Sequence, residues 1–206
     1  MSKEKCEKIN IMTLGNSSVG KTSFIWKYTE NRFNEYLLAT NGFDIKTKIF
    51  KAANKKEYSI NFFDTAGQEK YRAISLNVIK NADGILLMYD LTNKESFQAI
   101  TTWMDGVKKE KGEDFPIILV GNKSDKEGRQ VTREEEEKLA NEYNVSFFET
   151  SNKTGENINE ASLNLINKTI EKYEKDKLSG NIKENIKLNK KTSKMKNKKS
   201  CKKCGW

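Results

Sequence analysis

The chain has 206 residues, enough for one domain with a full hydrophobic core, and it carries a formal net charge of +9 with no histidine. The charge is unevenly placed: residues 177–206 contain eleven lysines and one glutamate, so the preceding residues carry one more acidic than basic side chain. A globular part without basic excess gives no reason to expect nucleic-acid binding.

The three cysteines, Cys6, Cys201 and Cys204, are too few for a disulfide framework, which excludes a small secreted scaffold. The opening residues Met-Ser-Lys-Glu-Lys lack the apolar core of a secretory signal, and no run approaches eighteen apolar residues. Serine at position 2 excludes N-myristoylation. We therefore expect a protein that is made and kept in the cytosol.

Apolar runs and amphipathic stretches alternate along the chain. The apolar runs predict strands at residues 9–14, 43–52, 58–64, 84–91, 116–121 and 145–148. The amphipathic stretches predict helices at residues 21–30, 94–110, 132–143 and 157–173. Thr132 and Glu135 have the spacing of a capping box. This order predicts an α/β fold: a mostly parallel, six-stranded sheet with helices on both faces, whose ligands bind at the carboxyl ends of the strands.

The composition changes near residue 177. Beyond this point the chain is rich in lysine and asparagine and has few large apolar side chains, so it cannot bury enough surface to offset its conformational entropy. We predict a globular domain over residues 1–176 and a disordered basic tail over residues 177–206.

The strongest motif is Gly-Asn-Ser-Ser-Val-Gly-Lys-Thr at residues 15–22, which fits the phosphate-binding pattern G-x-x-x-x-G-K-[ST] between a strand and a helix. The glycines let the backbone wrap a phosphate, and the N–H groups of the loop and the helix N-terminus point at negative charge. Lys21 would reach the β- and γ-phosphates of a nucleotide, and the Thr22 hydroxyl would bind Mg²⁺. A chance match in an ordinary turn is the alternative, and the flanking strand and helix count against it. The predicted nucleotide contacts here are Gly15, Ser17, Ser18, Val19, Gly20, Lys21, Thr22 and Ser23.

A second motif, Asp-Thr-Ala-Gly-Gln at residues 64–68, follows an apolar strand. The Asp64 carboxylate can hold the hydration shell of Mg²⁺, and the Gly67 N–H can meet a γ-phosphate. Gln68 can orient a water that attacks the γ-phosphate. Gln68 and Lys21 are therefore the candidate catalytic residues.

Two further motifs follow later strands. In Asn-Lys-Ser-Asp at residues 122–125, an aspartate can accept hydrogen bonds from N1–H and the exocyclic amine of guanine, a donor pair that adenine lacks. In Glu-Thr-Ser-Asn-Lys at residues 149–153, backbone amides can meet the guanine oxygen. Each motif is weak alone, but four in this order, each at the end of a strand, predict binding of GTP and GDP. The predicted base contacts are Asn122, Lys123, Asp125, Ser151, Asn152 and Lys153.

The order and spacing of these motifs resemble the Ras superfamily over about residues 8–173, which implies the P-loop NTPase fold called the G domain. Lys-Tyr-Arg-Ala-Ile-Ser at residues 70–75 and Leu-Met-Tyr-Asp-Leu-Thr at residues 87–92 resemble the Rab branch. The resemblance of residues 39–45 to switch I implies that the Thr40 hydroxyl joins Mg²⁺ in the GTP state. It also implies that Phe33 lies against the edge of the guanine.

Several positions depart from the Rab pattern. Asn41 and Ile45 replace an isoleucine and a phenylalanine, Phe63 replaces a tryptophan, and residues 78–82 replace Tyr-Tyr-Arg-Gly-Ala. Ser18 stands where many relatives have glycine, which leaves the intrinsic hydrolysis rate open. None of the departures in the switch segments touches phosphate or base, so they bear on effector choice and indicate a divergent Rab.

The resemblance implies a switch in vesicle traffic that recruits effectors in the GTP state and acts as a monomer. Its other implied partners are an exchange factor, a GTPase-activating protein, a prenylation escort and a GDP-dissociation inhibitor. The alternatives are a GTP-binding scaffold with slow turnover and a Ras- or Rho-like signalling protein; the absence of a C-a-a-X ending counts against the second.

The chain ends in Cys-Lys-Lys-Cys-Gly-Trp. Without histidine, and with only Cys6 elsewhere, four zinc ligands cannot be assembled, and a redox pair has no fitting context in a polar tail. Similarity to Rab tails implies prenylation of Cys201 and Cys204, with the lysines drawn to an anionic membrane surface on the cytosolic side of an organelle. A solvated tail and a nuclear localisation signal remain the alternatives.

Overall fold

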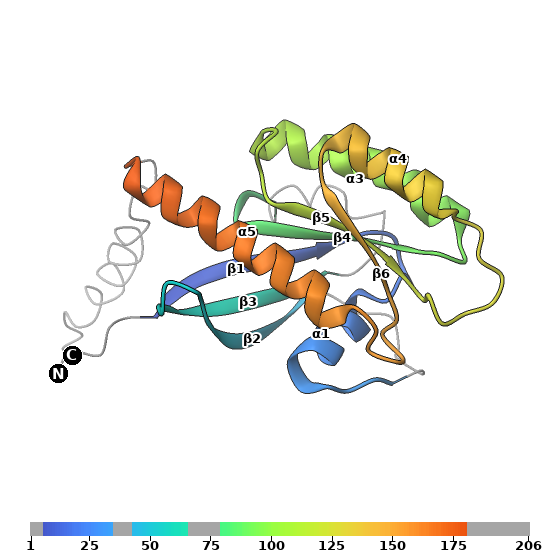
Figure 1. Cartoon of the computed structure of the whole chain (residues 1–206), viewed down its shortest axis with the longest axis horizontal. Coiled ribbons are helices and arrows are strands. Elements are labelled where there is room, and N and C mark those ends of the chain that lie inside the picture. The colour runs from blue at the N-terminus through green and yellow to red at the C-terminus, as the bar shows by residue number, and fades with distance from the viewer. Residues whose placement is uncertain (1–5, 35–42, 66–78, 181–206) are drawn as a thin grey trace, which may run out of the picture. The chain divides into compact units, whose positions relative to one another are not determined.

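The computed structural model of the chain describes residues 6–34, 43–65 and 79–180 and confirms the predicted α/β fold (Figure 1). Six strands form one sheet in the order β2-β3-β1-β4-β5-β6. Every neighbouring pair is parallel except β2 and β3, which are antiparallel. The strands are β1 (Glu7–Leu14), β2 (Phe43–Lys51), β3 (Glu57–Thr65), β4 (Gly84–Asp90), β5 (Ile117–Asn122) and β6 (Ser146–Thr150).

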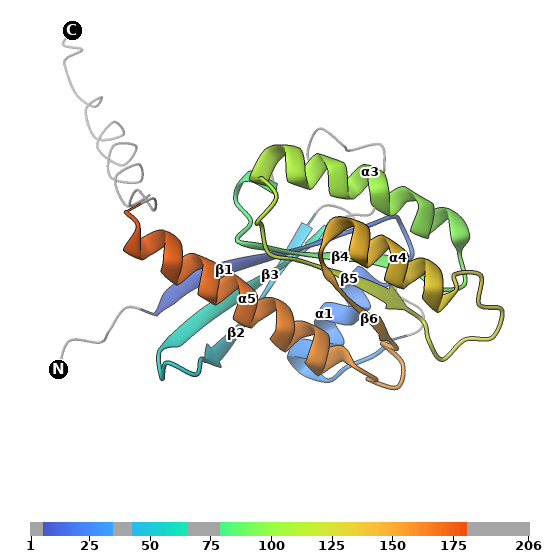
Figure 2. The same ribbon diagram turned by 45° about the horizontal axis from the view of Figure 1, so that its top comes forward.

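Helices cover both faces of the sheet, α1 and α5 on one and α3 and α4 on the other (Figures 1 and 2). Those whose bounds lie within the described residues are α1 (Lys21–Glu30), α3 (Lys94–Lys111), α4 (Arg133–Tyr143) and α5 (Ile158–Leu178). The predicted strands and the first three helices match these bounds within about two residues.

The central strand β4 is buried at every residue, as expected for a strand covered on both faces. Leu87 and Tyr89 belong to the core beneath α3 and α4. Gly84 faces α5, since a Cβ at this position would lie 2.3 Å from the hydroxyl oxygen of Thr169. Because side chains alternate along a strand, the fully buried Met88 lies on the α5 side.

The ends of α4 and α5 follow from local chemistry. The predicted capping box is present in α4: Thr132 accepts from the backbone N–H of Glu135, whose side chain accepts from the N–H of Thr132. Helix α5 continues to Leu178, beyond the predicted end at residue 173, because residues 174–178 are mostly good helix formers. The first glycine after the start of this helix is Gly180, which has a φ of 74° and lies just beyond the helix end. None of the helices in the described ranges has the length and apolar character needed to cross a bilayer.

The chain divides into two compact units, Met1–Lys172 and Tyr173–Trp206. The first contains the whole sheet and is the subject of the following sections. In the second, the described residues 173–180 comprise the last turns of α5 and its end. The predicted boundary at residue 176 and the predicted tail disorder stay predictions, because residues 181–206 lie outside the described part of the chain.

Candidate functional site

The predicted phosphate-binding loop joins β1 to α1 at the carboxyl end of the sheet. Gly15 and Gly20 have φ values of 135° and 102°, which side-chain-bearing residues rarely adopt. A Cβ on Gly15 would lie 2.1 Å from the carbonyl oxygen of Met88, and one on Gly20 would lie 2.3 Å from Nδ2 of Asn122. Both glycines are therefore required by the close approach of neighbouring strands, as well as by the turn of the loop.

Lys21 lies inside this loop. Its side chain is buried, and Nζ donates to the carbonyl oxygens of Gly15 at 2.9 Å and Asn16 at 2.7 Å. The ammonium group thus provides positive charge within the loop, as its position in the motif predicts.

Two predicted metal-binding residues, 42 positions apart in the chain, are in contact. The Thr22 hydroxyl at the start of α1 donates to Oδ2 of Asp64 at 2.6 Å, and Asp64 is buried near the end of β3. Hydroxyl and carboxylate oxygens are the ligand types that Mg²⁺ prefers. The donor set of this pair fits Mg²⁺.

Asn122 links the phosphate-binding loop to the segment after β6. It is 1% exposed, and its Nδ2 donates to the Val19 carbonyl at 2.8 Å. Its Oδ1 accepts from the backbone N–H of Asn152 at 3.3 Å, and the Asn152 side chain donates to the Gly20 carbonyl at 2.9 Å. These bonds bring three of the four predicted motifs together around one buried amide.

The carboxylate predicted to read guanine is oriented by a neighbouring motif. The Ser151 hydroxyl donates to Oδ1 of the exposed Asp125 at 2.7 Å. Lys123 has a φ of 71° and forms an ion pair with the carboxylate of Asp90, with Nζ 2.5 Å from Oδ2. Both contacts fix the loop that follows β5.

For the remaining predicted site residues, the structure gives only their degree of burial or does not describe them. Ser17, Ser18 and Lys153 are exposed, and Ser23 is half-buried in α1. The Phe33 side chain is 38% exposed. Thr40, Gly67, Gln68, Cys201 and Cys204 lie outside the described residues.

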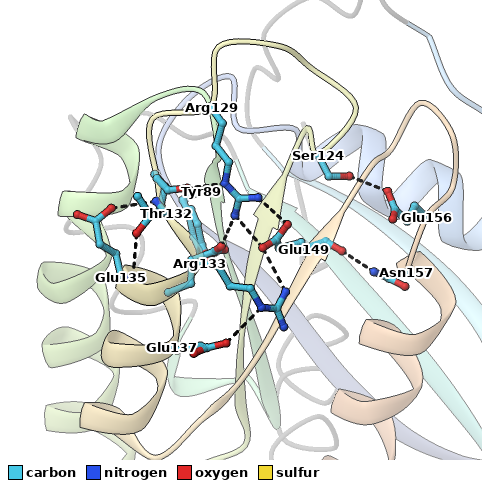
Figure 3. Close-up of polar contacts among 12 residues, drawn as sticks. Tyr89, Ser124, Arg129, Thr132, Arg133, Glu135, Glu137, Glu149, Glu156 and Asn157 are labelled. Carbon is cyan, nitrogen blue, oxygen red and sulfur yellow. Dashed lines mark hydrogen bonds and ion pairs between the residues drawn. The ribbon is translucent and has the colours of Figure 1, made fainter.

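Two features of the site were not predicted. Trp103 is half-buried in α3, and its Nε1–H donates to Oδ1 of Asn16 in the phosphate-binding loop at 3.2 Å. The second feature is a cluster of charged side chains behind the guanine motifs (Figure 3), which we call the Arg129 cluster. It comprises Tyr89, Arg129, Glu136 and Glu149.

In the Arg129 cluster, one guanidinium is shared by two carboxylates. Arg129 donates to Oε2 of Glu136 at 2.6 Å and to both carboxylate oxygens of Glu149 at 2.7 and 2.9 Å (Figure 3). The Tyr89 hydroxyl donates to the other oxygen of Glu136. Four consecutive glutamates at residues 134–137 give no sign of which one is buried, so the sequence carried no usable signal for this cluster.

The environment shifts the acidity of both carboxyls. Burial raises the pKa of Glu136 to about 7, and the nearby Glu149 adds to the rise. Hydrogen bonding to Arg129 lowers the pKa of Glu149. Burial, followed by the charge of Glu136, raises the pKa of Tyr89, so its hydroxyl stays a donor.

Comparison with known proteins shows which protein family the chain resembles. The model of the Ras family matches residues 10–171. Ras-related protein Rab-3C of Bos taurus is 38% identical over 184 residues, which cover 86% of this chain and 80% of that protein. Ras-related protein Rab-13 of Rattus norvegicus is 35% identical over 202 residues, which cover 98% of each. EF-hand calcium-binding domain-containing protein 4B of Homo sapiens is 42% identical over 156 residues, 75% of this chain but only 21% of that longer protein. With a family match over most of its length and two Rab relatives matched nearly end to end, the chain belongs to the Ras family of small GTPases and is of the Rab type.

Proposed function

We propose that this GTPase holds the phosphates of GTP and GDP with residues 15–23 and a Mg²⁺ ion with Thr22, Thr40 and Asp64. The observation that carries the proposal is the 2.6 Å contact between the Thr22 hydroxyl and the Asp64 carboxylate beside the loop that encloses Lys21. When bound, Mg²⁺ would neutralise phosphate charge and link the nucleotide to both side chains.

The guanine base would lie between the loops after β5 and β6, with Phe33 against its edge. Asp125 would accept from the base, held in position by the Ser151 hydroxyl, while Lys123 and Lys153 flank it. The buried side chain of Asn122 would support the site indirectly, because its hydrogen bonds join these loops to the phosphate-binding loop. This arrangement supports selection of guanine over adenine.

Hydrolysis would use Gln68 to orient water and Lys21 to balance charge on the phosphates, while Thr40 and Gly67 hold the switch segments in the GTP state. The arginines of the described part of the chain, Arg32, Arg129 and Arg133, each pair with a glutamate. None of the three lies within the four predicted nucleotide-binding motifs. We therefore expect slow turnover until a GTPase-activating protein supplies positive charge.

Release of GDP with and without EDTA tests the metal site. Wild-type protein should release a fluorescent GDP much faster when Mg²⁺ is chelated, and Asp64→Ala should release it fast in both conditions. Asp105→Ala, at an exposed position of α3, is the matched control and should behave as wild type. An undiminished EDTA effect in Asp64→Ala would contradict the assignment.

A single-turnover assay tests Gln68. Gln68→Leu should lower the hydrolysis rate of preloaded GTP with little change in nucleotide affinity, since leucine cannot orient water. Unchanged hydrolysis would remove Gln68 from the mechanism.

We further propose a cycle between cytosol and a membrane in vesicle traffic, driven by prenylation of Cys201 and Cys204. Two lipid anchors together with a polybasic tail give stable attachment, and each lysine near an anionic leaflet contributes roughly 1 kcal/mol. An escort protein and a GDP-dissociation inhibitor would handle the lipidated chain, and effectors would bind its GTP state.

The intact mass of protein recovered from eukaryotic cells tests this cycle. Two isoprenoids should be present, and the double variant Cys201→Ser, Cys204→Ser should lose both and leave the membrane fraction. Cys6→Ser is the control and should keep them. Unmodified wild-type protein would exclude the lipid-anchored cycle.

A further inference from the structure

The Arg129 cluster joins side chains from four parts of the fold. Tyr89 lies at the end of β4, Arg129 in the connection between β5 and α4, Glu136 in α4, and Glu149 near the end of β6. Figure 3 shows the guanidinium of Arg129 pointing toward the carboxylate of Glu149. The cluster thus links α4 to the ends of β4 and β6 and to the connection that follows β5, and guanine motifs follow β5 and β6.

Each strand residue of the cluster lies next to a residue of the nucleotide site. Tyr89 precedes Asp90, which forms the ion pair with Lys123. Glu149 precedes Thr150, whose hydroxyl approaches Oδ1 of Asn122 at 3.5 Å. A change in the cluster would therefore reach the base-binding loops within one residue on each side.

The backbone packs closely around the cluster. A Cβ on Gly121, directly before Asn122, would lie 2.6 Å from Oε1 of Glu136 and 3.1 Å from the Tyr89 ring. The glycine leaves room for the carboxylate to approach the β5 backbone. Glu136 therefore packs against the β5 backbone one residue before the guanine motif begins.

The connection after β5 is held at its far end by Arg129. The N–H groups of Gln130 and Val131 donate to the Leu91 carbonyl, and Nε of Arg129 donates to the Val131 carbonyl at 2.6 Å. With these bonds and the two carboxylates, the connection that carries residues 122–125 is fixed at both ends.

Burial of a carboxylate in a protein core costs desolvation free energy. Glu136 is 0% exposed, and well-packed apolar residues commonly replace buried ion pairs at no loss of stability. Charged groups instead supply links of fixed direction, as the bidentate contact of Arg129 with Glu149 does. Hydrogen bonds of fixed direction between two loops hold the loops in a defined position relative to each other.

We propose that Arg129 is a positioning residue for guanine recognition. Glu136 and Glu149 hold the Arg129 guanidinium, which fixes residues 122–125 relative to residues 149–153. Asp125 and Ser151 therefore stay in position to bind the base. The role rests on the proposed assignment of guanine to these two loops.

Release rates of GDP and inosine diphosphate test the proposal. Inosine lacks the exocyclic amine that the Asp125 carboxylate would bind, so wild-type protein should release it faster than GDP. Arg129→Ala should speed GDP release by roughly tenfold or more, because it removes the guanidinium that bridges the carboxylates of Glu136 and Glu149. It should speed inosine diphosphate release less, so that the ratio of the two rates falls toward one. Arg129→Lys keeps the charge but loses the bidentate contact and should give an intermediate ratio.

Matched variants separate positioning from general loss of stability. Glu136→Gln should lower the ratio, whereas Glu137→Gln, at the exposed neighbouring position, should not. A general loosening of the fold would speed both nucleotides by the same factor, and an unchanged ratio in Arg129→Ala and Arg129→Lys would overturn the proposal. Where Arg129→Ala does not fold, Arg129→Lys and Glu136→Gln decide alone. Equal release of both nucleotides by wild-type protein would instead reject the guanine assignment.

Discussion

Replacement of Glu136 by glutamine tests how the Arg129 cluster couples to pH. Burial raises the pKa of this carboxyl from 4.5 to about 7, while the unfolded chain keeps the ordinary value. Between these two values the folded protein holds a proton that the unfolded chain has released. Stability from this group is therefore fully present below pH 4.5 and is lost as pH rises to about 7.

The magnitude follows from the size of the shift. One pKa unit corresponds to about 1.4 kcal/mol, so a shift of this size removes at most about 3 kcal/mol between pH 4.5 and 8. Glutamine cannot ionise and resembles the protonated carboxyl. The free energy of unfolding of wild type minus that of Glu136→Gln should therefore fall by up to about 3 kcal/mol as pH rises.

Urea unfolding with saturating Mg²⁺ and GDP, measured at half-unit steps from pH 5 to 8, provides the comparison. Glu137→Gln serves as the control, because this side chain is 52% exposed and should leave the pH dependence of wild type unchanged. A constant difference between wild type and Glu136→Gln across the range would refute the reasoning, since it would mean that Glu136 ionises alike in the folded and unfolded chain.

Three further predictions concern the phosphate-binding loop, the cap of α4 and the hydrogen bond of Trp103. Gly20→Ala should abolish stable nucleotide binding, measured as nucleotide retained on the purified protein, because the new Cβ would lie 2.3 Å from Nδ2 of Asn122 at a φ of 102°. Thr132→Ala should lower the free energy of unfolding by about 1 kcal/mol through loss of the α4 cap, and an unchanged urea midpoint would show that the cap is dispensable. Trp103→Phe replaces the indole with a smaller phenyl ring and removes the donor to Asn16, and it should lower the free energy of unfolding by about 1 kcal/mol; calorimetry that shows no shift in Tm would contradict the contribution of this bond.

Much of the fold was predictable because its signals are local. Helix α1 occupies residues 21–30 as predicted, since a glycine loop starts it and Asn31 in a left-handed conformation ends it. The capping box of α4 was likewise readable from two residues three positions apart. The end of α5 was predicted too early, because helix propensity continues to Leu178 although the composition already changes there.

The links within the site were not predictable in this way. Asn122 was predicted as a nucleotide contact, but its bond to the Val19 carbonyl joins residues 103 positions apart. Trp103 and Asn16 are 87 positions apart. Such pairs meet only because parallel strands bring their carboxyl ends to one edge of the sheet, and no local pattern records which side chains then face each other.

By itself, the sequence determined that the chain folds as an α/β domain and binds a guanine nucleotide, because glycines at set spacing after a strand and an aspartate after another are sufficient to indicate that chemistry. Only the tertiary structure decided which of four adjacent glutamates is buried, and that Arg129 pairs with it and with Glu149. The physical reason is that burial of a charge depends on the helix face turned to the core and on a partner supplied by another element of the fold, and both are properties of packing.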